Sequence, residues 1–303
     1  MKPGWRLPAL GLAALLALAA LFHPQWPLRR DVYRYLFVLD ITQSMNARDY
    51  HAEGLPPGRL GYARAAIRRV LHDLPCGSEV GLGLFTTQSV QFLFQPIEVC
   101  GHFPVIDDVL GHIDWRMAWA GDSNIAQGLH AAVHGVAGME PRIRLAFFTD
   151  GQETPPLTMK PVFHGKHGEV LGTIVGVGGL SPSPVPRYDR ENKPLGNWEN
   201  ADIAVPPVST TDYSEKVEVQ TLPKSGPYLS WLDEAHLKDL AATLGLRYHR
   251  LDDPAALSRL LREPDFAERR PAETDLRPLL GLAALTLLLA VFVFEARPKI
   301  RRH

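Results

Sequence analysis

Short apolar runs alternate with helical apolar stripes along most of this 303-residue chain. Runs rich in β-branched, aromatic and aliphatic residues predict buried strands, at residues 33–39, 143–148, 169–177 and 246–251. Apolar positions spaced by three and four predict helices, at residues 59–74, 105–113, 125–136, 231–244 and 254–261. Strands that alternate with helices predict an α/β fold with a doubly wound, mainly parallel sheet.

Residues 79–85 and 90–94 break the alternation, because they predict two strands joined by a polar turn. This hairpin would add one antiparallel edge strand to the sheet. Cys76 and Cys100 are the only cysteines and are equidistant from residue 88, in the turn. In a regular hairpin they would lie opposite each other, at a distance that a disulfide accepts. The alternative is two buried free thiols, because a bulge in either strand would change the register.

Both ends of the chain are apolar. Residues 7–22 hold no charge and lie between Trp5 and Trp26, and a helix over that span would measure about 33 Å, close to the bilayer core. Residues 279–294 form a second uncharged run, followed by basic residues that favour a cytoplasmic C-terminus, at Arg297, Lys299, Arg301 and Arg302. Two spans would place the soluble domain between them in the periplasm. A cleaved signal peptide is the alternative for the first run.

These patterns divide the chain into an N-terminal membrane anchor or signal segment (1–30), an α/β domain (31–264), a linker (265–277) and a C-terminal transmembrane helix with a basic cytoplasmic tail (278–303). Residues 180–227 form an insert rich in Pro, Ser, Asp and Asn, with a short hairpin predicted near 216–221. Such a long irregular segment is either a contact surface or a floppy insert. The net charge of -1 gives no sign of nucleic-acid binding.

Polar oxygens follow two of the predicted strands. Asp40, Thr42 and Ser44 come after the first, Asp150 after the strand at 143–148, and Ser123 just before a predicted helix. The carboxyl ends of parallel strands share one edge of the sheet, where ligands bind. An all-oxygen set suits a hard divalent cation, Mg²⁺ or Ca²⁺, with Mn²⁺ also suitable. The alternative is that these residues only cap helices, a position where Ser, Thr and Asp are also favoured.

The three fragments resemble the metal-ion-dependent adhesion site of the von Willebrand factor A family, whose pattern is Asp-x-Ser-x-Ser, then a distant Thr and a distant Asp. Asp40, Thr42 and Ser44 match the first part with one Thr for Ser, Ser123 stands where the family has Thr, and Asp150 in Thr-Asp-Gly matches the last part. Both departures keep a hydroxyl. The resemblance implies a Rossmann-like domain that binds another protein through a metal-bridged carboxylate. Ser44 has no flanking glycines of a nucleophile elbow, so the protein is expected not to be an enzyme.

The arrangement of the chain also resembles membrane-anchored bacterial Bat and aerotolerance-type proteins. The stretches 74–79 and 113–119 resemble MxaL-type proteins, which are associated with maturation of methanol dehydrogenase. That resemblance implies a protein of the bacterial inner membrane that assists assembly or calcium insertion, with methanol dehydrogenase or its maturation factors as partner. The alternatives are a Bat-type envelope stress protein or a metal-dependent hydrolase. No histidine falls in a recognisable catalytic motif, so no catalytic residue is predicted.

Overall fold

The computed structural model describes residues 3–139, 143–156, 159–203, 213–216 and 225–296. The chain divides into two compact units. Unit 1 consists of Met1–Arg30 and Arg269–His303, and unit 2 is Asp31–Glu268. Unit 2 contains every residue predicted to bind metal.

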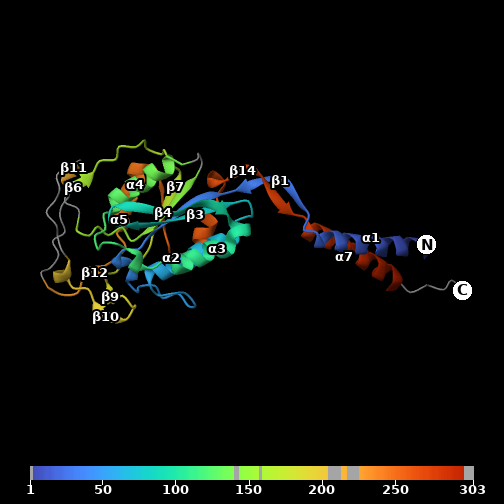
Figure 1. Ribbon diagram of the computed structural model, residues 1–303, viewed down its shortest axis with the longest axis horizontal. Helices are drawn as coiled ribbons and strands as arrows, with labels where there is room; N and C mark the ends of the chain where they lie inside the picture. Colours follow the sequence, from blue (N-terminus) through green and yellow to red (C-terminus); the bar gives the residue numbers. More distant parts are fainter. Residues whose placement is uncertain (1–2, 140–142, 157–158, 204–212, 217–224, 297–303) are drawn as a thin grey trace. The chain divides into compact units, whose positions relative to one another are not determined.

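Unit 2 is built around a six-stranded sheet (Figure 1). Across the sheet the strands are β13 (Arg247–Arg250), β7 (Gly172–Gly176), β5 (Arg144–Thr149), β2 (Arg34–Asp40), β3 (Glu79–Thr86) and β4 (Ser89–Glu98). All neighbouring pairs are parallel except β3 and β4, which are antiparallel. The mainly parallel sheet with one antiparallel edge strand confirms the sequence prediction.

The residues of β2 are buried on both sides of the sheet, as the middle strand of a doubly wound fold requires. Tyr35, Phe37 and Leu39 join one apolar cluster, and Leu36 and Val38 join the other. The first cluster includes residues from α2 (Arg59–Asp73), α3 (Val99–His112) and α6 (Pro254–Leu260). The second includes residues from α4 (Ile125–Ala137) and α5 (Glu234–Leu244). Helices therefore cover both faces, and the polar edge of the sheet is left for a site.

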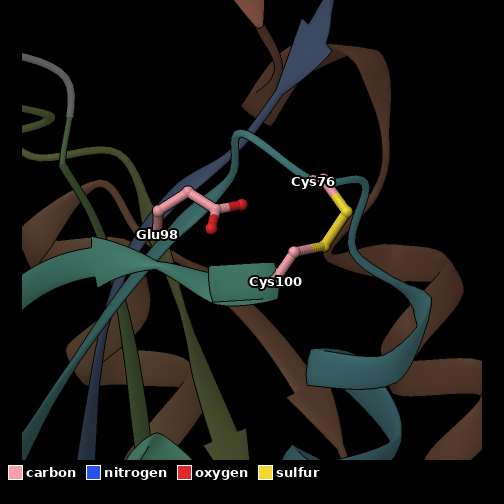
Figure 2. A group of neighbouring side chains, drawn as sticks. All are labelled: Cys76, Glu98 and Cys100. Carbon is pink, nitrogen blue, oxygen red and sulfur yellow. A yellow bond between two sulfur atoms is a disulfide. The ribbon is translucent and has the colours of Figure 1, made fainter. Parts of the chain in front are cut away.

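Cys76 and Cys100 form a disulfide with their Cα atoms 5.2 Å apart, as predicted (Figure 2). The predicted hairpin register is wrong, because two bulges shift the pairing of β3 with β4 and the last pair is Glu79 with Glu98. Neither cysteine lies in a strand. The carboxylate of Glu98 accepts hydrogen bonds from the backbone N–H of Gly77 (2.7 Å) and of Gly101 (2.6 Å), which hold the two cysteine-bearing segments together.

Cys76, Glu98 and Cys100 place their sulfur and oxygen atoms within 4.8 Å of one another, a spacing that also occurs in metal sites. Both sulfurs are bonded to each other, and both Glu98 oxygens accept backbone hydrogen bonds. The cluster therefore stabilises the end of the hairpin and offers no free ligand to a cation.

The insert is folded where the structure describes it. Its short antiparallel pairs are β8 (Ser183–Pro184) with β12 (Leu229–Ser230), β9 (Pro186–Tyr188) with β10 (Pro194–Asn197), and β11 (Tyr213–Lys216) with β6 (Met159–Pro161). The hairpin predicted near 216–221 lies almost wholly outside the described residues. The described part of the insert therefore forms short antiparallel pairs, two of which join it to strands outside it.

Unit 1 contains two helices that lie side by side, α1 (Arg6–Leu21) and α7 (Arg277–Ala296) (Figure 1). The strand β1 (Gln25–Val32) pairs with β14 (Glu268–Asp275). Most of the segment predicted as a linker, residues 265–277, forms the strand β14. Strand formation also explains why the first helix stops at residue 21.

Among the residues that the structure describes, no helix is both long enough and apolar enough to cross a membrane. The two predicted spans are not confirmed. The helix α1 has 16 residues, or about 24 Å at 1.5 Å per residue, because the chain turns at His23 and begins β1 before it reaches Trp26. The basic residues at 297–302 lie outside the described part of the chain.

Candidate metal site

Asp40 ends the central strand β2 and is fully buried. Its Oδ1 accepts hydrogen bonds from the backbone N–H of Thr42 (2.9 Å) and from the Thr42 hydroxyl (2.7 Å). Its Oδ2 accepts a hydrogen bond from the hydroxyl of Thr149 (2.7 Å), at the end of β5. The Thr42 and Ser44 hydroxyl oxygens are 3.3 Å apart. The structure thus brings Asp40, Thr42 and Ser44 together and connects them to the end of β5 by a hydrogen bond.

Asp150 follows β5 and is also fully buried. Its Oδ1 accepts a hydrogen bond from the backbone N–H of Gln152 (3.0 Å). Its Oδ2 accepts hydrogen bonds from Nη1 of Arg59 (2.7 Å) and from the hydroxyl of Ser230 (3.2 Å). Arg59 also pairs with Asp49, at 2.6 Å, and is fully buried. The chain therefore supplies one positive charge to the polar edge.

The sequence reasoning missed Arg59, Ser230 and Thr149. Arg59 is the first residue of the amphipathic helix α2, so its position is also typical of a solvated helix end. Thr149 precedes the predicted ligand Asp150 in the Thr-Asp-Gly fragment. Its hydroxyl, at the end of the strand, was the one sequence feature that could have marked it as part of the site. Ser230 carries no local signal, because it lies 80 residues from its partner Asp150.

Ser123 is held by backbone hydrogen bonds from both sides. Its N–H donates to the carbonyl of Thr154 (2.6 Å), and the Thr154 N–H donates to the carbonyl of Ser123 (2.8 Å). The N–H of Asn124 donates to the carbonyl of Thr87, in the turn between β3 and β4 (2.5 Å). Ser123 is 3% exposed, and its hydroxyl has no hydrogen-bond partner among the described residues. A buried hydroxyl without a partner is costly, and a cation would remove that cost.

Glu153 caps the helix that follows Ser123. Its carboxylate accepts hydrogen bonds from the backbone N–H of Ile125 (2.8 Å) and of Ala126 (2.9 Å). Nε2 of His236 lies 3.1 Å from Oε1 of the same carboxylate. The cap of α4 thus comes from the loop after β5, which fixes Ser123 relative to Asp150.

The electrostatics of the edge favour a bound cation. Burial, and to a smaller extent the negative charge of Asp150, raise the pKa of Asp40 to about 7, although hydrogen bonds from Thr149 and Thr42 oppose the shift. A divalent cation beside Asp40 would favour its ionised form.

The donor set fits a hard cation, because it consists only of carboxylate and hydroxyl oxygens. The residues that would hold the ion are Asp40, Thr42, Ser44, Ser123 and Asp150. Asp150 would reach it directly or through water, since one of its oxygens already pairs with Arg59.

A cavity of about 350 Å³ lies beside these hydroxyls. Thr42, Ser44 and Ser123 line it, so three of the five predicted ligands face one cavity. Trp198 and Tyr228, from the insert and the segment just after it, also line this cavity. The polar edge is therefore reached through a cavity that the insert helps to form.

Residues 35–152 match the family model of the von Willebrand factor type A domain. This segment contains all five predicted metal ligands, β2 to β5, and the helices between them. In this part of the chain the fold is therefore the α/β fold of a von Willebrand factor type A domain, with a mixed, mostly parallel sheet.

The chain is also similar to several solved structures, including two from Bacteroides species. An aerotolerance-related membrane protein from Bacteroides fragilis is 16% identical, with a TM-score of 0.49, over 76% of this chain and 96% of that one. The conserved hypothetical protein BatB from Bacteroides thetaiotaomicron is 18% identical, with a TM-score of 0.47, over 75% of this chain and 96% of that one. Comparison with the curated proteins finds no match.

Proposed function

We propose that this chain is a metal-dependent protein-binding module and not an enzyme. Its ion would be Mg²⁺ or Ca²⁺, with Mn²⁺ as a substitute, held by Asp40, Thr42, Ser44, Ser123 and Asp150. The observation that carries the proposal is the buried hydroxyl of Ser123, which has no partner among the described residues and lies at the same cavity as two further hydroxyls. Bound there, the cation would supply an electrophilic position that accepts a carboxylate from another protein.

The residues of this chain determine how strongly the site attracts that carboxylate. Three of the five ligands are neutral hydroxyls, so only Asp40 and Asp150 compensate the charge of a divalent cation. Arg59 neutralises part of the charge of Asp150, at 2.7 Å. Both features favour a partner carboxylate over water as a further ligand.

We also propose that unit 1 associates with the bacterial inner membrane and that unit 2 is periplasmic. The support for membrane association is the exposure of large apolar side chains on both helices of unit 1, with Leu7 at 80% and Phe292 at 68%. Contiguous exposed apolar surface is typical of membrane or protein contacts. The support for the periplasm is the disulfide, which persists in oxidising compartments.

A narrower proposal is that the partner is methanol dehydrogenase or one of its maturation factors, and that the role is assembly or calcium insertion. It rests only on the resemblance of residues 74–79 and 113–119. A general role in the bacterial envelope of the Bat or aerotolerance type is the broader alternative.

Calorimetric titration of the full chain in detergent with Mg²⁺, Mn²⁺ and Ca²⁺ tests the proposal. We expect binding by the wild type, and its loss in Asp40→Ala because the remaining charge no longer offsets dehydration of the ion. Asp108→Ala is the matched control, since the Asp108 side chain is 73% exposed. Ser123→Thr retains the hydroxyl and should still bind metal. Equal binding by Asp40→Ala and the wild type would show that the site is wrong.

A further inference from the structure

The insert and its flanks give the cavity an apolar side. Its apolar residues are Trp198, Ile203 and Tyr228, together with Pro155 from the loop after β5, here called the insert wall. The hydroxyls of Thr42, Ser44 and Ser123 form what we call the hydroxyl end. At about 350 Å³ the cavity is near the lower limit of ligand pockets, which measure roughly 300–1,000 Å³. Its volume suits one or two side chains of a partner rather than a whole helix or strand.

The insert wall is tied to the hydroxyl end by hydrogen bonds. The N–H of Trp198 donates to the carbonyl of Val185 (2.9 Å), and the N–H of Tyr228 donates to the carbonyl of Trp198 (2.8 Å). The hydroxyl of Tyr228 lies 2.8 Å from that of Thr154. Thr154 in turn exchanges two backbone hydrogen bonds with Ser123. The wall is thus positioned by the same segment that positions a predicted ligand.

The aromatic side chains of the wall are further held in place. Tyr228 is 7% exposed, and the guanidinium carbon of Arg187 lies 4.6 Å from the ring centroid of Trp198. Glu199 and Pro227 form an antiparallel bridge just beside these residues. A wall that is rigid before binding loses little conformational entropy when it contacts a partner.

The charges at the cavity make entry of an acidic group dependent on metal. Asp122 and Asp202 line the cavity, although Arg187 pairs with Asp202 at 3.4 Å and offsets part of its charge. Asp40 is hydrogen-bonded to Thr42 at the hydroxyl end. Without a cation these carboxylates repel an acidic side chain. The side chains of the insert wall are uncharged, so their contacts with a partner do not depend on whether the cation is bound.

We propose that the cavity binds two neighbouring residues of a partner protein, an acidic side chain at the hydroxyl end and a large apolar side chain against the insert wall. This inference rests on the proposed function, because the acidic side chain is bound through the cation. The metal gives affinity for an exposed carboxylate in general. The insert wall gives selectivity among partners that all carry one.

Fluorescence anisotropy with labelled octapeptides, the full chain in detergent and Mg²⁺ tests the inference. The probes contain Asp-Phe or Phe-Asp, with Asp-Ser, Asn-Phe and Lys-Phe as comparisons. We expect one of the Asp and Phe peptides to bind about tenfold more tightly than Asp-Ser, because burial of the ring adds affinity. Asn-Phe and chelator-treated samples should lose binding.

Variants of the wall separate selectivity from metal binding. We expect Trp198→Ala to reduce the affinity for the preferred peptide to that for Asp-Ser, while calorimetry shows unchanged Mg²⁺ affinity. Trp198→Phe keeps an apolar ring and should retain most of the preference. Trp119→Ala is the matched control, because Trp119 is 55% exposed and is not among the residues that line the cavity.

The outcomes distinguish the inference from the proposed function. If metal binds but all Asp peptides bind equally, or none binds, or Trp198→Ala keeps the preference, the inference is wrong and the metal site stands. If no divalent cation binds, the proposed function fails. Tight binding of Lys-Phe to the metal-free protein would overturn both, because the cavity would then be a site for a basic partner.

Discussion

The two units of this protein place charged and apolar side chains in opposite ways. Unit 2 fully buries the carboxylates of Asp40 and Asp150, whereas unit 1 exposes leucines, including Leu15 at 61% and Leu282 at 60%. Each arrangement is unfavourable in water, because a buried charge needs a counter-charge and a large exposed apolar surface is rare in a soluble monomer. The comparison supports the two proposals made above, that unit 2 binds a cation in addition to its own Arg59 and that unit 1 contacts an apolar surface.

Replacement of Arg59, which supplies the counter-charge to the buried carboxylates of unit 2, should have the largest effect on stability. Replacement of Arg59 by Met leaves the carboxylates of Asp49 and Asp150 without their partner. Removal of one member of a buried ion pair costs about 3–5 kcal/mol. We expect the free energy of unfolding of unit 2, measured in urea without divalent cation, to fall by about this amount.

The control for this prediction is Arg68→Met. Arg68 pairs with Asp107, but the Arg68 side chain is 41% exposed, so the loss should be at most about 1 kcal/mol. Added Mg²⁺ should restore part of the stability of Arg59→Met, because the ion binds the folded state and compensates Asp150. Equal losses in the two variants would mean that Arg59 is not the internal counter-charge.

The second prediction concerns the disulfide, which belongs to unit 2 alone. Its cysteines are 24 positions apart, and closing a loop of that size contributes roughly 3–4 kcal/mol in the chain-entropy model. The double variant Cys76→Ala, Cys100→Ala should lose about this much stability in urea and should bind vesicles as the wild type does. Mass mapping of the untreated protein under non-reducing conditions provides the check, and two freely alkylated thiols would contradict the pairing or the compartment.

The third prediction tests unit 1. Leu15→Lys and Leu282→Lys each place a charge where the wild type exposes an apolar side chain, so each should weaken partitioning into phospholipid vesicles by about 2 kcal/mol. Flotation of the full chain with vesicles measures the effect. The control Leu93→Lys lies on β4 in unit 2 at 37% exposure and should change nothing. Mg²⁺ affinity should be the same in all three variants. If vesicle partitioning and Mg²⁺ affinity changed together in these variants, the two units would not have the separate roles proposed.

The fourth prediction concerns pH and is the smallest. Burial lowers the pKa of His236, but its hydrogen bond with Glu153 and the charges of Glu153, Asp233 and Asp239 outweigh burial, so the pKa is raised above 6.5. Because the folded pKa exceeds the unfolded one, this contribution is fully present below about pH 6.5. It is lost as the pH rises through the folded value.

Urea unfolding of the wild type and His236→Gln at pH 6 and pH 9 measures that contribution. We expect the wild type to be more stable than the variant by about 1 kcal/mol at pH 6, with a smaller difference at pH 9. Titration of other groups is common to both proteins and cancels in the difference. A difference that is constant, or larger at pH 9, would show that His236 does not act as a cation beside the cap of α4.

Much of unit 2 could be predicted because its elements follow local patterns. The strand at residues 33–39 was predicted one residue from the observed β2, since a strand buried on both faces is apolar at successive positions. Helix α3 was predicted to begin six residues too late, at residue 105, whereas it begins at Val99. Pro104 lies inside the observed helix, where proline is disfavoured.

The sequence by itself predicted the strands of the six-stranded sheet and the disulfide partners. It also brought five oxygen side chains forward as a predicted metal site, because strand ends of a parallel sheet meet at one edge whatever the details of packing. Only the tertiary structure decided which groups complete that edge. Arg59 is 91 residues from Asp150 along the chain, and Tyr228 is 74 residues from Thr154. Contacts over such separations depend on how helices and the insert pack against the sheet, and no local periodicity encodes them. The length of α1 was likewise decided by the pairing of β1 with β14, because a strand that begins at Gln25 ends the helix before it.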